Sequence, residues 1–251
     1  MSPGSYRLDI EYNGAGFSGW AAQSGLRTVQ GELETALETV LRERVTLTVA
    51  GRTDAGVHAV GQVASFKTEA LVPENLGRRL NGLCPDDIAV TVAGRAADDF
   101  DARADATSRS YVYRLLTRRP SSPFECGRAL WWPHAINREA LDVCAAALVG
   151  QHDFTAFTPT QTDHVHFRRI VSSAGWEECS GDVLAFRITA DAFMRSMVRV
   201  LVGTMLEVSS GRRDVAGFTA LLKGAERSEA GDTAPPHGLY LESVAYEGPS
   251  T

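Results

Sequence analysis

The order in which strand-like and helix-like segments follow one another constrains the fold of this 251-residue chain more than any other feature. In the first hundred residues, apolar side chains alternate in four segments, which is typical of strands, and recur with helical spacing in two others. Thr28 is a suitable N-cap for the first of these helices. The order is strand, helix, strand, strand, helix, strand over residues 6–12, 28–41, 45–50, 57–66, 73–82 and 87–94.

The same order returns after the polar segment 98–109. Two occurrences of βαββαβ predict an α+β fold of two ferredoxin-like halves, residues 1–105 and 106–251. We expect a largely antiparallel sheet with helices on one face and a catalytic cleft where the halves meet. The second set of segments comprises a strand at 110–116, a helix at 137–150, strands at 167–177 and 183–190, helices at 193–208 and 214–222, and a strand at 238–246.

Composition indicates a globular protein without a membrane span. Hydrophobic residues make up 44% of the chain and charged residues 22%, and no apolar run approaches the roughly 20 residues that cross a bilayer. The first twelve residues lack the basic flank and apolar core of a signal peptide, so we expect a cytoplasmic location. The four cysteines are scattered without CxxC spacing, which favours free thiols over a disulfide framework or a zinc site.

The net charge of −6 argues against nucleic acid as a partner only if the charge is spread evenly. Lysine occurs only at Lys67 and Lys223, so nearly every cation is an arginine, whose planar guanidinium suits phosphate. Genomic base composition would produce the same bias. Local clusters of arginine, rather than the net charge, therefore decide whether RNA is a plausible partner.

The segment AGRTDAGVHAVGQVASF (residues 50–66) concentrates an ionisable trio, Arg52, Asp54 and His58, among small residues. Ala55 and Gly56 follow the aspartate and would let another molecule approach the backbone closely. These residues make Asp54 the leading candidate for chemistry. The glycines of GAGFSG (residues 14–19) lack the spacing of a dinucleotide site, and we interpret that loop as an RNA-facing element or a tight turn.

The expected helix at 193–208 is apolar around nearly its whole circumference, which predicts that it is buried. It nevertheless contains Arg195 and Arg199, four residues apart and therefore expected on one face. A guanidinium cannot lose its charge, so burial requires a carboxylate or several carbonyl acceptors. The candidate partners are Asp191 and Glu207, which are close in sequence, and Asp54 in the other half.

The segment around Asp54 closely resembles the catalytic segment of the TruA-type tRNA pseudouridine synthases, in which the aspartate of R-T-D-x-G-V-H-A attacks the target uridine. The resemblance covers almost the full chain, with its motifs in family order. Three residues in two segments depart from the family pattern, Asp101 in FDAR and Ser196 and Val200 in SMVRV, while the aspartate, tyrosine and arginine of the site are unchanged. The other matching segments are residues 11–20, 28–34, 80–90, 109–113, 192–208 and 230–246.

The resemblance implies the pseudouridine synthase fold and the isomerisation of uridine in the anticodon stem-loop of tRNA, without metal or organic cofactor. It also implies a homodimer across which one tRNA lies. Asp54 would be the nucleophile, Tyr111 of the RSYVY strand would meet the flipped-out target base, and Arg199 would reach the carboxylate of Asp54. Without the resemblance, Tyr111 is more simply a core residue of a strand.

Several residues are candidate RNA contacts with structural alternatives. Arg52 would contact RNA or form a salt bridge, and His58 would contact RNA or fix the loop by hydrogen bonds. Arg195 would lie at the outer end of its helix, where it reaches phosphate or water. Arg78 and Arg103 belong to a wider set of arginines expected to form a positive furrow, together with Arg79, Arg109, Arg168 and Arg169.

Two functions of other classes compete with this interpretation. A non-catalytic RNA-binding module of the same fold would have no need of a carboxylate facing an anionic ligand. A nucleoside-cleaving hydrolase would favour a second catalytic carboxylate to activate water, and none is evident near the motif. The sequence therefore favours the isomerase.

Overall fold

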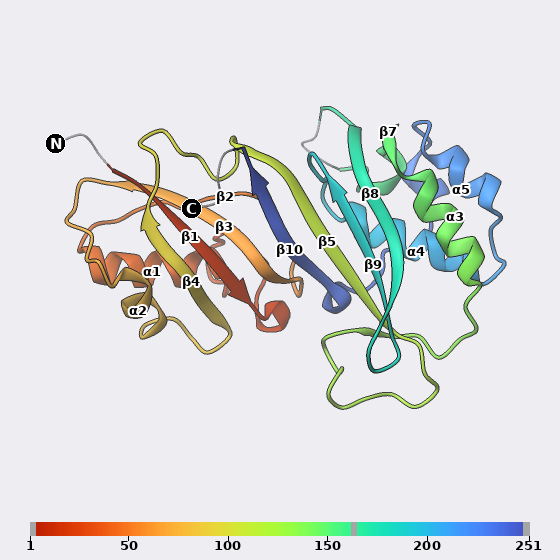
Figure 1. The fold of residues 1–251 in the computed structure, drawn as a ribbon, viewed down its shortest axis with the longest axis horizontal. Helices are drawn as coiled ribbons and strands as arrows, with labels where there is room; N and C mark the ends of the chain where they lie inside the picture. Colours follow the sequence, from red (N-terminus) through yellow and green to blue (C-terminus); the bar gives the residue numbers. More distant parts are fainter. Residues whose placement is uncertain (1–3, 162–164, 248–251) are drawn as a thin grey trace. The chain divides into compact units, whose positions relative to one another are not determined.

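The computed structural model describes residues 4–161 and 165–247, and the chain forms two compact units (Figure 1). Unit 1 contains Met1–Thr107 together with Leu241–Thr251, and unit 2 contains Ser108–Tyr240. Most of the strand at 239–246 thus lies in the same unit as the first strand of the chain. The expected halves, 1–105 and 106–251, assign that strand to the second half, and as a domain division they stay a prediction.

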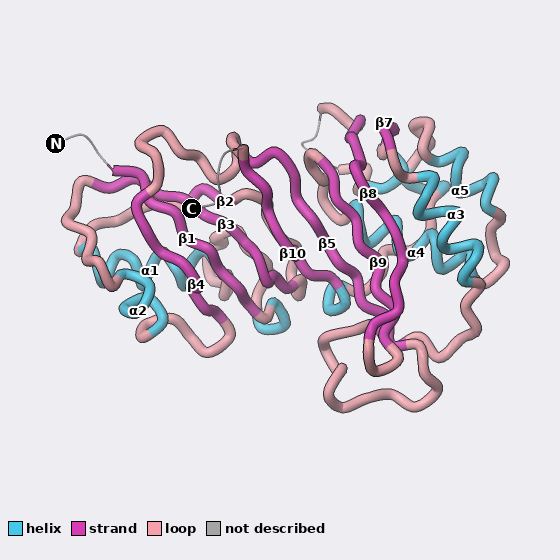
Figure 2. The backbone as a smooth tube through the Cα atoms, viewed as in Figure 1, coloured by secondary structure: helices cyan, strands magenta, loops and turns pink. Residues whose placement is uncertain are grey.

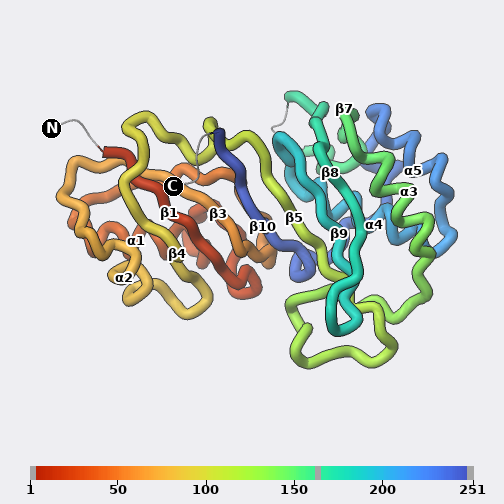
Figure 3. Tube along the Cα trace, in the orientation of Figure 1, coloured from red at the N-terminus to blue at the C-terminus, as the bar shows by residue number. Residues whose placement is uncertain are grey.

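The strands of unit 1 that follow one another in the sheet include several antiparallel pairs. Strand β1 (Gly4–Tyr12) pairs antiparallel with β3 (His58–Thr68) on one side and with β4 (Ile88–Arg95) on the other. Strand β10 (Leu239–Tyr246) follows β3 in the strand order, so residues at the two ends of the chain share one sheet (Figure 3). The short strand β2 (Thr48–Val49) pairs with β3.

Helix α1 (Val29–Leu41) forms as its sequence predicts. The Thr28 side chain accepts a hydrogen bond from the Gly31 N–H, which satisfies one of the free donors of the first turn. Leu33 and Leu37 are fully buried, and burying each leucine contributes about 1.5 to 3 kcal/mol. The second helix of this unit, α2 (Leu76–Asn81), packs against β4 and α1.

The sheet of unit 2 has the strand order β5, β9, β8, β7. Strands β5 (Ala106–Leu116) and β8 (Arg168–Cys179) each pair antiparallel with β9 (Val183–Ala190), and β7 (Gly150–Asp153) pairs with β8. The two-residue strand β6 (Leu130–Trp131) is parallel to β5.

The described residues of unit 2 also form the helices α3 (Arg138–Ala147), α4 (Met197–Ser209) and α5 (Val215–Leu221). Most of α4 is buried, as its apolar circumference predicts. Helix α3 contacts α4, α5 and β8. Loops connect most of these elements (Figure 2), and four contain single 3-10 turns at Gly14–Gly16, Thr155–Phe157, Arg227–Glu229 and Pro236–Gly238.

The α+β class and the largely antiparallel pairing are confirmed, and the main differences concern element ends. Helix α2 begins three residues after the proline that was expected to start it, and β2 is much shorter than the expected strand 45–50. Strands β6 and β7 were not predicted, because two and four residues are too few to show a period. Among the described residues, no helix is long and apolar enough to cross a membrane.

Candidate active site

Asp54 lies in a tight turn between β2 and β3 in unit 1. The Val57 N–H donates to the Asp54 carbonyl at 3.1 Å, and Gly56 adopts φ +78°, a left-handed conformation that favours glycine. Asp54 is partly exposed, whereas its neighbours Arg52 and Ala55 are exposed. The turn therefore presents the carboxylate residue at the surface of its unit.

The glycine-containing loop 13–20 holds this turn through its backbone. The Trp20 N–H donates to the Thr53 carbonyl at 3.1 Å, and the Gly56 N–H donates to the Phe17 carbonyl at 3.3 Å. A Cβ atom on Gly14 would lie 1.9 Å from the Val57 carbonyl oxygen, so only glycine fits there. The loop is accordingly a backbone clasp that contacts the chain on both sides of Asp54, whereas its sequence led us to expect an RNA-facing element or a tight turn.

A buried polar network supports the same turn from the sheet. The Tyr12 hydroxyl lies 2.7 Å from Thr53 Oγ1, and Gln62 Nε2 donates to the Tyr12 hydroxyl at 3.3 Å and to the Gly51 carbonyl at 2.8 Å. Burial raises the pKa of Tyr12 to about 12, partly offset by the hydrogen bonds to Thr53 and Gln62. The residue before Asp54 is thus hydrogen-bonded through both its carbonyl and its side chain.

The candidate RNA contacts of unit 1 divide into exposed arginines and one buried histidine. Arg52, Arg78 and Arg103 are exposed, as phosphate contacts must be. His58 is only 2% exposed, and its Nδ1 accepts a hydrogen bond from the Gly14 N–H at 3.0 Å. This geometry favours the structural alternative for His58, which is to fix the clasp loop against β3.

Tyr111 lies on β5 in unit 2, opposite Ile188 of β9. It is buried, and its ring meets the Phe193 ring edge to face, with centroids 4.9 Å apart and planes at 76°. The Tyr111 ring therefore packs against the Phe193 ring within the buried part of unit 2. Arg109, on the same strand, is also buried and donates from Nη1 to the Asp191 carbonyl at 2.9 Å, so its expected role in a phosphate furrow is not supported by its burial.

The expectation that Arg195 and Arg199 share one helical face is wrong. Helix α4 begins at Met197, and Ser196 before it has φ 58°, so Arg195 precedes the helix. A left-handed residue turns the chain sharply and removes the helical relation between positions 195 and 199. Arg195 is exposed, as expected for a residue that reaches phosphate or water.

Arg199 is half-buried in the first turns of α4, and its Nε donates to the Ala234 carbonyl at 2.8 Å. In the described part of the chain, Glu207 forms its ion pair with Arg213 at 3.1 Å. Asp191 Oδ1 accepts from the backbone N–H groups of Ile170 and Ala192. The two carboxylates close in sequence are therefore engaged elsewhere, and the expected pairing of Arg199 with Asp54 stays a prediction.

Tyr113 is a neighbour of Arg199 that the sequence did not single out. It is fully buried on β5, and its hydroxyl donates to the Pro235 carbonyl at 2.8 Å. Burial raises the pKa of Tyr113, and the nearby positive charge of Arg199 lowers it in part. Tyr113 is one of several buried polar residues whose hydrogen-bond partners are distant in sequence, so no local pattern predicts them. The others are Tyr12, Thr53 and Gln62 in unit 1. In the described ranges, no three His, Cys, Asp or Glu side chains cluster so as to hold a metal ion.

Comparison with known proteins agrees with the motifs. Residues 10–104 and 144–247 match the family model described as tRNA pseudouridine synthase. A tRNA pseudouridine synthase A of Corynebacterium glutamicum is 45% identical over 257 residues, covering 96% of this chain and 88% of that protein. Those of Myxococcus xanthus and Bacillus subtilis are 42% and 39% identical, covering 97% and 96% of this chain and 92% and 98% of theirs. With a family model matching most of its length and relatives at this identity, the chain belongs to the tRNA pseudouridine synthase family.

Proposed function

We propose that this enzyme isomerises uridine to pseudouridine in the anticodon stem-loop of tRNA, with Asp54 as the nucleophile. The observation that supports this role most directly is the way the Asp54 turn is held. Backbone hydrogen bonds from loop 13–20 fix it on both sides of the carboxylate, while Asp54 itself stays partly exposed. A rigidly held, accessible carboxylate suits covalent catalysis, in which a small displacement of the nucleophile is costly.

The reaction balances without a co-reactant. The bond between N1 of the base and C1′ of the ribose breaks, the base turns, and C5 bonds to C1′. The proton on C5 leaves and N1 ends protonated, so substrate and product have the same atoms. A carboxylate can attack C1′ or C6 to make the first step possible, and a base close to C5 is needed for the last.

Tyr111 and Arg199 are the proposed partners of Asp54 in unit 2. The target base must leave its stack, and the Tyr111 ring, held by Phe193, offers it an aromatic surface. Arg199 carries a permanent positive charge that would keep the nucleophilic carboxylate ionised. Arg52, Arg78, Arg103 and Arg195 are exposed and would bind tRNA phosphates. We propose further that the enzyme acts as a homodimer, which sedimentation of the free protein and of its tRNA complex would test. We also propose that it is located in the cytoplasm.

The test of the nucleophile is Asp54→Asn, measured by release of tritium from tRNA labelled at C5 of uridine. The amide keeps the shape of the carboxylate but is a far poorer nucleophile, so the rate should fall at least about 1000-fold, equivalent to about 4 kcal/mol in the barrier. Affinity for tRNA should stay within about threefold. A variant that keeps a tenth of the wild-type rate would overturn the assignment.

The matched control is Asp9→Asn in β1, because Asp9 is a carboxylate of the same unit that forms a local ion pair with Arg7. It should leave the rate unchanged. Mass spectrometry of the tRNA after chemical labelling of pseudouridine then separates the alternatives. The isomerase yields a labelled nucleoside, a binding module yields no product, and a hydrolase leaves an abasic site and releases free uracil.

A further inference from the structure

One side of helix α4 is covered by the segment 229–235, which we call the strap. Arg199, Gly203 and Glu207 follow one another at intervals of four residues and therefore form one row on the helix. The strap runs along this row in the opposite direction: Ala234 lies at Arg199, Asp232 at Gly203 and Gly231 beside Glu207. The helix and the strap belong to the same unit.

Arg199 contacts the strap through both its backbone and its side chain. The Ala234 N–H donates to the Arg199 carbonyl at 3.1 Å, and the Arg199 Nε donates to the Ala234 carbonyl at 2.8 Å. Pro235, which follows Ala234, is also held in place, because its carbonyl accepts a hydrogen bond from the Tyr113 hydroxyl at 2.8 Å. A hydrogen bond to Nε sets the plane of the guanidinium and hence the direction of its two terminal amino groups.

The next turn of α4 seats the middle of the strap. A Cβ atom on Gly203 would lie 1.8 Å from the Asp232 carbonyl oxygen, so the strap backbone passes directly over a glycine. Thr204 is completely buried, and its Oγ1 accepts from the Gly231 N–H at 3.0 Å while donating to the Val200 carbonyl at 2.7 Å. These contacts fix how far the strap lies from the helix.

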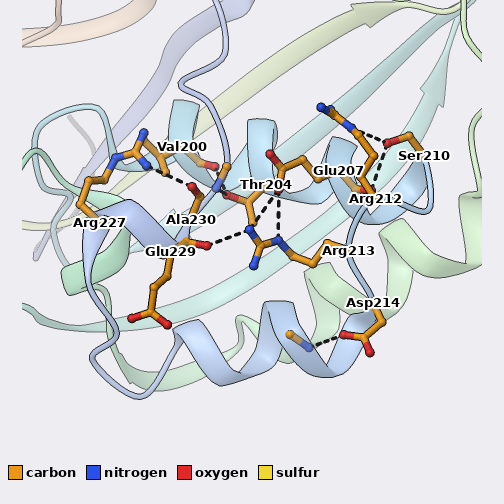
Figure 4. A network of polar contacts seen from close by, with 12 residues as sticks. Val200, Thr204, Glu207, Ser210, Arg212, Arg213, Asp214, Arg227, Glu229 and Ala230 are labelled. Carbon is orange, nitrogen blue, oxygen red and sulfur yellow. Dashed lines mark hydrogen bonds and ion pairs between the residues drawn. The ribbon is translucent and has the colours of Figure 1, made fainter.

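Arginines also hold the strap, mainly at the end that is farthest from Arg199 (Figure 4). Arg213 forms the ion pair with Glu207 and donates from Nη2 to the Glu229 carbonyl at 2.7 Å. Arg227 donates to the Ala230 carbonyl at 3.4 Å and to Thr233 Oγ1 at 3.1 Å. The strap is thus tied at both ends and in the middle.

We propose that the strap positions the guanidinium of Arg199 for the reaction, and that Gly203 and Thr204 are positioning residues that act through it. The inference rests on the proposed role of Arg199 in catalysis. An arginine side chain has many rotamers, and the Ala234 carbonyl selects among them only if the strap stays at its observed distance from α4. Loosening the strap should therefore lower kcat while leaving the KM for tRNA unchanged, since no strap residue is a proposed phosphate contact.

The experiment compares two pairs of variants by tritium release, with kcat and KM determined separately. Thr204→Val removes the acceptor for the Gly231 N–H, whereas Thr204→Ser keeps it. Asp232→Gly and Asp232→Ala both remove an exposed carboxylate, but only glycine loosens the strap backbone. Thr219→Val in α5 is the control for the loss of a threonine bond to a helical carbonyl away from the strap.

We expect Thr204→Val to lower kcat about tenfold or more and Asp232→Gly about threefold to tenfold, with KM within twofold of the wild-type value. Thr204→Ser, Asp232→Ala and Thr219→Val should keep at least a third of the wild-type kcat. Circular dichroism gives the folded fraction, to which each kcat is normalised. If Thr204→Val does not fold, the comparison of Asp232→Gly with Asp232→Ala still tests whether the strap positions Arg199, because Asp232 is exposed.

Arg199→Met serves as the reference that separates this inference from the proposed function. If Arg199→Met is inactive while Thr204→Val and Asp232→Gly match the wild type, the strap has no positioning role and the proposed function stands. If Arg199→Met is as active as the wild type, the proposed role of Arg199 and the positioning role of the strap are overturned, whereas the role of Asp54 is tested separately by Asp54→Asn.

Discussion

The hydrogen bond between Tyr12 and Thr53 offers a quantitative test of how the sheet supports the Asp54 turn. Tyr12→Phe removes the hydroxyl that lies 2.7 Å from Thr53 Oγ1 and 3.3 Å from Gln62 Nε2. Gln62 keeps a second acceptor in the Gly51 carbonyl. Thr53 Oγ1, in contrast, has no other hydrogen-bond partner among the described residues, and Thr53 is 7% exposed.

The expected cost follows from that asymmetry. A net hydrogen bond is worth about 0.5 to 1.5 kcal/mol, and leaving one buried partner unsatisfied raises the cost to about 1 to 3 kcal/mol. We expect Tyr12→Phe and Thr53→Val each to lower the free energy of unfolding by about 2 kcal/mol. The double variant removes both partners, so its cost should be well below the sum, with a coupling of about 1 to 2 kcal/mol.

The measurement is urea-induced unfolding of the four proteins in the cycle, followed by circular dichroism and by tryptophan fluorescence. Tyr6→Phe is a matched control, because the Tyr6 hydroxyl forms no hydrogen bond with the part of the chain that is described and its ring stacks on Phe66. It should change stability by less than about 0.5 kcal/mol. Additive costs in the double variant would refute the idea that the two hydroxyls support each other.

Three further outcomes follow from the structure. Burial raises the pKa of Tyr12 from 10 to about 12, so the contribution of the neutral hydroxyl to stability is complete below pH 10 and is lost as the pH rises to 12. The difference in the free energy of unfolding between the wild type and Tyr12→Phe should therefore disappear over that range. Gly14→Ala should lower the free energy of unfolding by about 3 kcal/mol and should also lower kcat. Gly94→Ala, where the added Cβ would meet open space, should change neither quantity. Raising salt from about 50 to 200 mM should weaken tRNA binding about fiftyfold or more if the four exposed arginines contact phosphates, and a flat titration would exclude this.

Periodicity predicted the strands and helices well wherever one face is buried. The alternation in β1 and the spacing of Leu33 and Leu37 in α1 reflect burial, which a local window can detect. The start of α4 was missed because the apolar pattern runs on through Phe193 and Met194, and only the left-handed Ser196 marks the break. A serine carries no signal for that conformation.

The residues proposed for the chemistry stand out in the sequence, whereas the contacts that support them do not. Asp54 stands out because small residues flank it, and the resemblance to the family motif points to Tyr111 and Arg199, whose roles stay a prediction. The clasp at Gly14 and the Ala234 carbonyl act through backbone atoms, which every residue has, so the sequence gives no sign of them. The glycines alone indicate that another part of the chain passes close to the backbone, and they do not identify which part.

The placement of strand β10 has a consequence for how the protein is made. Residues 241–247 belong to unit 1, where Val244 and Tyr246 pack on the cluster that contains Ala102, and the Tyr246 hydroxyl donates to the Ala102 carbonyl at 2.8 Å. Strand β10 is synthesised more than 170 residues after β3, its neighbour in the strand order, so the sheet that carries the Asp54 turn lacks a strand while unit 2 is being made. A chain that has not yet reached residues 239–246 has Asp54 but not the completed sheet, so we expect the Asp54 turn to gain its full support only after unit 2 has been synthesised.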